Sequence, residues 1–104
     1  MSDKRRENFV QFRGTLEREP RVFQKEEVQV HLFLKGNTER GTLYMPVKVK
    51  GEVAERLSQK GETWKTGDEI YVEGELDWDS YEKNGEKRYQ TIIVAQKIQK
   101  IEEV

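Results

Sequence analysis

The sequence predicts an all-β domain, a small five-stranded barrel with one short helix between its third and fourth strands. Apolar and polar residues alternate in five separate stretches, as they do in strands with one buried face. Only residues 51–60 show the spacing of an amphipathic helix. A chain of 104 residues with 34% hydrophobic side chains is long enough for one modest core and too short for a second domain.

The first strand is expected within residues 8–19, where apolar side chains recur at every second position. Gly14 in the middle of this run favours a bulge or a bend, as at a barrel corner, and Pro20 breaks the run. Residues 1–7 are polar, so we expect them to be flexible and to precede a single domain that spans residues 8–104.

The second and third strands are expected at residues 27–35 and 42–50, joined by a short connection at residues 36–41. Their alternation assigns the inner faces to Val28, Val30, Leu32 and Leu34, and to Leu43, Met45, Val47 and Val49. Pro46 lacks a backbone N–H, which favours an edge or a bulge at that point of the third strand.

The helix is expected over residues 51–60, and the fourth strand follows at residues 68–78. Trp78 has the same phase as Ile70 and Val72, so we expect it in the core. Asn84-Gly85 predicts a tight hairpin, after which residues 88–101 form the last strand. Five strands with a helix between the third and the fourth are the layout of an OB-fold, a partly open Greek-key barrel.

Composition excludes several classes of function. The chain has no cysteine and one histidine, which excludes disulfides, thiolate chemistry and His-rich metal sites, so we expect no cofactor and no metal. No nucleophile–base pair stands out, so we expect no enzyme. No apolar run is long enough for a bilayer, and the start lacks the apolar region of a signal peptide. We therefore expect a cytoplasmic protein with no membrane partner.

The outer faces of the second and third strands carry the main candidate site. Their rings and amines are His31, Phe33, Lys35, Tyr44, Lys48 and Lys50. Unstacked bases can lie on exposed rings, and lysines neutralise phosphates without regard to sequence. We therefore expect this face to bind single-stranded nucleic acid with weak sequence preference. The alternative is that Phe33 and Tyr44 pack against a neighbouring subunit while the lysines are solvated.

Other residues left two interpretations open. Trp64 either stacks a base from an exposed loop or caps the open end of the barrel. Arg13, like Arg18 and Arg21, either contacts phosphates or serves a subunit interface. The acidic face with Glu73, Glu75, Asp77 and Asp79 is interpreted as solvated and salt-bridged, and its negative field repels nucleic acid.

Four stretches resemble the bacterial single-stranded DNA-binding protein (SSB) family. These are VQFRGTLEREP at residues 10–20, MPVKVKGEVAERL at 45–57, TGDEIYVEGEL at 66–76 and SYEKNGEKRYQTIIV at 80–94. They follow the family's order and cover most of residues 8–101. The resemblance implies an OB-fold that wraps single-stranded DNA, assembles as a homo-oligomer, usually a tetramer, and takes part in DNA replication, repair and recombination.

By position in those motifs, Tyr44 and Tyr81 match base-stacking tryptophans, and Lys50 stands where the family often has a stacking aromatic residue. The sequence also departs from the family. The connection at residues 36–41 is shorter than the family's long basic loop, and Asp77 and Asp79 lie in a stretch that is typically basic. The chain ends at Glu102-Glu103-Val104, without the acidic tail that recruits other proteins.

The function expected from residues and resemblance together is sequence-nonspecific binding of single-stranded DNA. The sequence does not distinguish a preference for DNA from one for RNA. The binding residues would be Phe33, Lys35, Tyr44, Lys48, Lys50, Tyr81, Arg13, His31 and Trp64. The alternative is an SSB-like domain with weak or no DNA binding that acts as a protein-interaction or accessory subunit. The near-neutral charge of −1, the two aspartates and the short connection favour that alternative.

Overall fold

The computed structural model describes residues 7–24, 26–59 and 64–102. The elements are β1 (Val10–Leu16), β2 (Arg21–Gln24), β3 (Val28–Thr38), β4 (Gly41–Lys50), α1 (Gly51–Gln59), β5 (Glu69–Lys83) and β6 (Glu86–Ile101). The flexible segment expected at residues 1–7 lies outside the described residues except for its last position. All five predicted strands and the helix are present, and several of the strands are longer than predicted.

The strands form one sheet in the order β1-β5-β6-β4-β3-β2, and a further pairing of β1 with β3 closes five of them into a barrel. Only β4 and β6 run parallel; the other pairs are antiparallel. The helix lies between β4 and β5, that is, between the third and fourth barrel strands. The predicted OB-fold is therefore confirmed. The sequence did not predict β2, because its four residues are too few to show an alternation.

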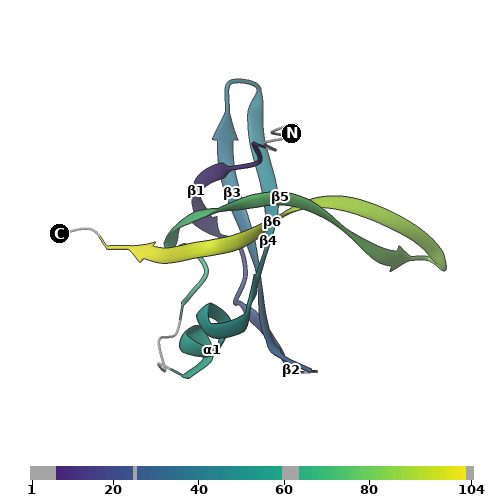
Figure 1. Ribbon diagram of the computed structural model, residues 1–104. Helices are drawn as coiled ribbons and strands as arrows, with labels where there is room; N and C mark the ends of the chain where they lie inside the picture. Colours follow the sequence, from purple (N-terminus) through teal and green to yellow (C-terminus); the bar gives the residue numbers. More distant parts are fainter. Residues whose placement is uncertain (1–6, 25, 60–63, 103–104) are drawn as a thin grey trace, which may run out of the picture.

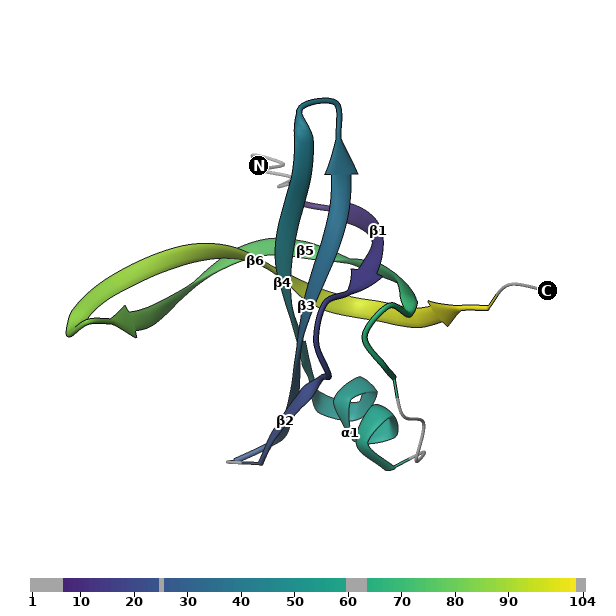
Figure 2. The same cartoon turned by 180° about the vertical axis from the view of Figure 1, so that it is seen from behind.

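The inner faces of the barrel strands supply the core. Its members are Leu16, Val30, Leu32, Leu34, Val47, Val49, Ala54, Trp64, Ile70, Val72, Ile93 and Ala95. Figures 1 and 2 show α1 at one end of the barrel and the tip of the β3–β4 hairpin at the other. Through Ala54 the helix reaches the core, so it covers the end of the barrel from which β4 emerges.

Close backbone contacts shape the barrel where β1 joins β3. A Cβ on Gly14 would lie 2.6 Å from the carbonyl oxygen of Lys35, so only glycine fits at this closing point. The sequence predicted a bulge or a bend at Gly14. What the structure shows at this position is a close approach of β1 to the backbone of β3. Pro46 fits its expected position, because β4 pairs with β6 only from Val47 onwards and has an open edge at the proline.

Both hairpin turns are tight. Thr38 pairs with Gly41, so only Glu39 and Arg40 form the β3–β4 turn, which is shorter than the predicted connection. Gly41 takes a φ of 139° there. At the other turn Asn84 and Gly85 have φ values of 53° and 79°. Two successive left-handed residues are the signature of the turn that Asn-Gly favours, so this prediction is confirmed.

The β5–β6 hairpin extends well beyond the barrel, as both views show (Figures 1 and 2). We call residues 76–83 of β5 and 86–92 of β6 the arm. The prediction that Trp78 lies in the core is wrong, because its side chain is 65% exposed. It keeps the phase of Ile70 and Val72, but at Leu76 the ribbon leaves the barrel and there is no core left to cover this face. Leu43, on the projecting β3–β4 hairpin, is exposed for the same reason.

Within the described ranges, the chain contains no helix with the length and hydropathy needed to cross a bilayer.

Candidate nucleic-acid interface

A groove of about 160 Å³ lies on the outer face of β3 and β4, between β2 and the base of the arm. Its lining consists of Arg18, Glu19, Arg21, Phe23, His31, Leu32, Phe33, Pro46, Val47, Lys48, Asp79, Gln90 and Ile92. The alternation of β3 and β4 places this lining, because the residues opposite the core face point outward. Of the predicted binding residues, the fold brings His31, Phe33 and Lys48 together in this groove.

Two aromatic rings form a stacked pair at the groove. Phe33 and Tyr44 lie with their ring centroids 5.6 Å apart and their planes 6° from parallel. They meet because Lys35 pairs with Tyr44 and Phe33 pairs with Pro46, which makes the two rings diagonal neighbours across β3 and β4. Phe33 is half-buried and Tyr44 is 48% exposed, so the monomer does not seal either ring. The predicted exposure of this face is confirmed.

A cation also lies over one of these rings. The guanidinium carbon of Arg18 is 4.6 Å from the centroid of Phe33. Arg18 follows β1, and the backbone N–H of Glu17 donates to the carbonyl of Phe33, which holds the segment against β3. The attraction between the guanidinium and the ring face is worth about 0.5–1 kcal/mol at an exposed site. Two side chains, Arg18 and Tyr44, therefore hold the ring of Phe33 in position.

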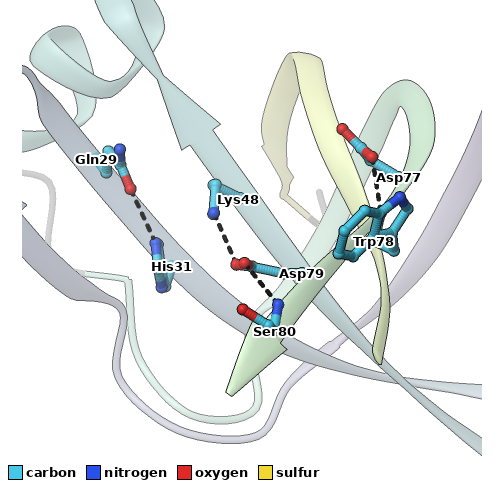
Figure 3. Close-up of polar contacts among 7 residues, drawn as sticks. All are labelled: Gln29, His31, Lys48, Asp77, Trp78, Asp79 and Ser80. Atoms are coloured by element: carbon cyan, nitrogen blue, oxygen red, sulfur yellow. Dashed lines mark hydrogen bonds and ion pairs between the residues drawn. The ribbon is translucent and has the colours of Figure 1, made fainter. Parts of the chain in front are cut away.

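An ion pair crosses the groove from β4 to the arm. The ammonium of Lys48 donates to a carboxylate oxygen of Asp79 at 2.7 Å (Figure 3). This hydrogen bond lowers the pKa of Asp79 below its ordinary value, so the carboxylate is charged at neutral pH. The second oxygen of Asp79 accepts from the backbone N–H of Ser80 at 2.9 Å. Lys48 thus reaches the groove with its charge already compensated.

His31 lies beside this pair and contributes a ring rather than a charge. Its Nε2 is 3.3 Å from the side-chain oxygen of Gln29 (Figure 3). The centroid of its ring is 4.7 Å from that of Phe23. Burial lowers the pKa of His31, the charge of Lys48 lowers it further, and Asp79 acts in the opposite direction. With a pKa below the ordinary value of 6.5, His31 is mostly neutral at pH 7.

The remaining predicted residues lie around the groove or away from it. Tyr81 lies on the arm two residues beyond Asp79, on the same face, and is 41% exposed. Lys50 is exposed at the end of β4. Lys35 and Arg13 line a second hollow, which Gly36 also borders. The guanidinium of Arg13 forms a 2.7 Å ion pair with Glu69, which lowers the pKa of that carboxylate.

Trp64 does not offer the exposed ring that its place among the binding residues would require, because its side chain is only 6% exposed and belongs to the core. Its Nε1 is buried with no hydrogen-bond partner among the described residues. Of the two interpretations left open, the structure therefore favours the packed ring over the base-stacking platform. Polar neighbours in the sequence do not show whether a ring among them is buried, which is why the pattern did not decide.

The sequence did not single out three contributors to the groove. Phe23 sits on the unpredicted β2 and packs on His31. Gln90 and Ile92 come from β6, which lies beside β4 in the sheet and so brings them to the groove. Asp77 and Asp79 were expected to form a solvated, salt-bridged face, and Asp79 does pair with Lys48. Among the described residues, no three His, Asp or Glu side chains are placed to hold a metal ion.

No curated protein sequence matches this chain. Among solved structures, it is similar to a deletion mutant of the single-stranded DNA binding protein from Thermus aquaticus, with 29% identity and a TM-score of 0.72 over 91% of this chain. The match covers 50% of the Thermus chain, so the present chain spans about half of that length. It is also similar to the SSB of Plasmodium falciparum in complex with ssDNA, with a TM-score of 0.78 and 16% identity. That match covers 97% of this chain and 100% of the Plasmodium chain, and it shows that the two chains share a fold. The single-strand binding protein family model matches residues 10–101, and the chain therefore belongs to that family.

Proposed function

We propose that the groove binds single-stranded DNA without reading its sequence, and that this binding, rather than catalysis, is the activity of the chain. The main observation behind this proposal is the stacked and partly exposed pair of rings, Phe33 and Tyr44. The pair lies at a groove that is lined by the cations Arg18, Arg21 and Lys48. Bases stack on such rings whatever their identity, at about 1–3 kcal/mol each. Family membership and the Thermus and Plasmodium structures support the proposal.

Within this proposal Phe33, Tyr44 and Tyr81 stack bases, and His31 adds a neutral ring to the groove. Lys35, Lys48 and Lys50 neutralise phosphates, and Arg13 contributes at the second hollow beside Lys35. A homo-oligomer, dimer or tetramer, acting in the cytoplasm remains part of the prediction. Among the described strands, β1 pairs with β3 only at Thr15 and Leu16, so a strand of a second copy has an edge to join there.

A titration of labelled oligothymidylate followed by fluorescence anisotropy tests the proposal. We expect binding to the single strand at low salt, with an affinity that falls as salt rises, because each neutralised phosphate of single-stranded DNA adds about 0.7 to the slope of log K against log salt. Double-stranded DNA of the same length is the control and should bind more weakly, since its bases are not free to stack. An oligouridylate shows whether RNA is also bound. Absence of any binding at low salt would reject the function.

One observation favours the alternative of a protein-interaction or accessory module. The charge of Lys48 is taken up by Asp79, so a phosphate must compete with an internal carboxylate. On such a module the groove would hold an acidic or aromatic peptide segment instead of a polynucleotide.

Replacing Asp79 separates the two functions. If the groove holds DNA, Asp79→Asn frees Lys48 and removes a negative charge, so we expect about fivefold tighter binding at low salt, which corresponds to one charge pair at about 4 Å in water. The salt slope should become steeper by about one phosphate contact. The asparagine oxygen can still accept from the backbone N–H of Ser80, so the local fold is preserved.

Asp77→Asn is the matched control, because Asp77 lies on the same strand face and its side chain also caps a backbone N–H, that of Trp78. It does not hold Lys48, so its effect should be smaller and limited to the general field. Equal effects of the two substitutions, or none, would show that the Lys48–Asp79 pair does not oppose DNA and would favour the accessory module.

A further inference from the structure

The second face of the arm carries an exposed aromatic cluster. Trp78 and Tyr89 are 65% and 59% exposed and touch each other edge to face, with ring centroids 5.3 Å apart. Leu76, 44% exposed, has the same phase on β5. Because Tyr81 and Asp79 have the opposite phase, this cluster lies on the face of the arm that points away from the groove. Clustered large apolar side chains on a surface mark a binding site more often than scattered ones do.

A positive charge accompanies the rings. The ammonium of Lys87 is 5.9 Å from the centroid of Tyr89. Tyr89 pairs with Ser80 and Lys87 pairs with Glu82, so the lysine lies on the same face, one step nearer the tip of the arm. Rings that can take bases next to an amine that can take a phosphate are the combination used for single strands. The pattern proposed for the groove is thus repeated on the opposite face of the same ribbon.

The free edge of β5 is closed to strand addition. The backbone N–H of Leu76 donates to the side chain of Asn8 at 2.9 Å. The backbone N–H of Trp78 donates to Asp77 at 2.8 Å and that of Ser80 to Asp79 at 2.9 Å (Figure 3). These are successive donors along one edge, and each already has a side-chain acceptor. A second chain cannot use them to extend the sheet without displacing these acceptors.

The area of the cluster also argues against a second copy as the occupant. The arm is a ribbon two strands wide, about 10 Å, since neighbouring strands lie about 4.8 Å apart. A stable protein interface needs about 800 Å² on each partner. Three apolar side chains on so narrow a ribbon fall far short of that, whereas a single base needs only the face of one ring.

We propose that Trp78, Tyr89 and Lys87 form a second contact for single-stranded polynucleotide, which leaves the groove past Tyr81 and folds over the arm. This inference rests on the proposed function of the groove. The path is short, because the arm is one layer thick and the strand has only to cross an edge of the ribbon to reach its other face. The arm would thereby lengthen the binding site beyond what the groove alone can hold.

Tryptophan fluorescence reports on this face directly. The chain has two tryptophans, of which Trp64 is buried and Trp78 exposed, so the emission of a Trp64→Phe variant comes from Trp78 alone. We would titrate it with oligothymidylates of about 8, 16 and 32 nucleotides, which bracket the roughly 4–16 nucleotides held by one OB-fold. Anisotropy of a label on the DNA measures binding independently. The wild-type chain with acrylamide, which reaches Trp78 and not the buried Trp64, replaces the variant if that variant does not fold.

We expect the longer oligonucleotides to quench Trp78 and protect it from acrylamide, while the shortest one binds without either effect. Trp78→Ala should weaken binding of the longest oligonucleotide about fivefold or more and leave the shortest unchanged, since about 1–3 kcal/mol of stacking is lost on the arm alone. Phe9→Ala is the matched control, because Phe9 is a 64% exposed ring outside the arm.

Three outcomes would overturn the second contact. The first is binding at every length with unchanged Trp78 emission. The second is protection of Trp78 that depends on protein concentration and not on DNA, which would identify a second copy as the occupant. The third is no anisotropy change with any oligonucleotide, and this outcome alone would also reject the function of the groove.

Discussion

Removing the ring of Tyr44 is expected to weaken binding of single-stranded DNA about 5- to 150-fold, which is the loss of one base stack of about 1–3 kcal/mol. Tyr44 is half-exposed and its ring is parallel to that of Phe33, so a base can continue a stack that the protein has already begun. Phe33→Ala should have an effect of similar size, because it removes the support of Tyr44 and the partner of Arg18.

The double substitution tests whether the two rings act together. Because they are in contact, their effects should not add, and the double variant should bind less weakly than the product of the single losses predicts. Anisotropy with labelled oligothymidylate measures the affinities, and thermal unfolding checks that each variant is folded. Tyr71→Ala is the control, since Tyr71 is a ring on β5, which is separated from β3 and β4 in the sheet order. If Tyr71→Ala lowered the affinity as much as Tyr44→Ala does, the proposal that bases stack on the rings of the groove would be rejected.

The sequence predicted the inner and outer faces of the barrel strands because alternation records which side of a strand is buried. Leu32 and Leu34 are buried, and the outward position of Phe33 and Tyr44 followed from the same pattern. Their mutual stacking was not predicted, since it depends on which residues of β3 and β4 lie opposite each other. That register is fixed by the two-residue turn at Glu39 and Arg40, and the predicted connection was longer.

Alternation also does not record where a strand leaves the barrel. Trp78 continues the phase of Val72, and nothing in the pattern distinguishes a buried inner face from the same face on a projecting ribbon. The contact between Lys48 and Asp79 is likewise not visible in the pattern, because it joins residues 31 positions apart on β4 and on the arm. The sequence pattern therefore presents the aspartates only as an obstacle to nucleic acid. It does not reveal that Asp79 binds Lys48, or that both aspartates accept hydrogen bonds from backbone N–H groups.

The start of the arm is set by a glycine, and its replacement should have the largest effect on stability. At Gly74 the pairing of β5 with β6 shifts by one residue: Glu73 pairs with Lys97 and Gly74 with Ala95, which leaves Gln96 as the extra residue of a bulge. A Cβ at Gly74 would lie 2.0 Å from the carbonyl oxygen of Val94 and 2.9 Å from its carbon. Both atoms are backbone, so the clash cannot be relieved by turning a side chain.

Gly74→Ala should therefore lower the free energy of unfolding by about 3 kcal/mol, the upper end for overpacked sites. For a domain of this size that corresponds to a drop of about 12–24 °C in Tm, measured by circular dichroism or calorimetry. Gly51→Ala is the matched control: its φ of 67° is strained for alanine, but nothing lies within 4 Å of the new Cβ. It should cost only about 1–2 kcal/mol. Equal losses in the two variants would mean that β6 moves away from the added methyl group, and that the bulge, rather than the glycine, sets the path of the arm.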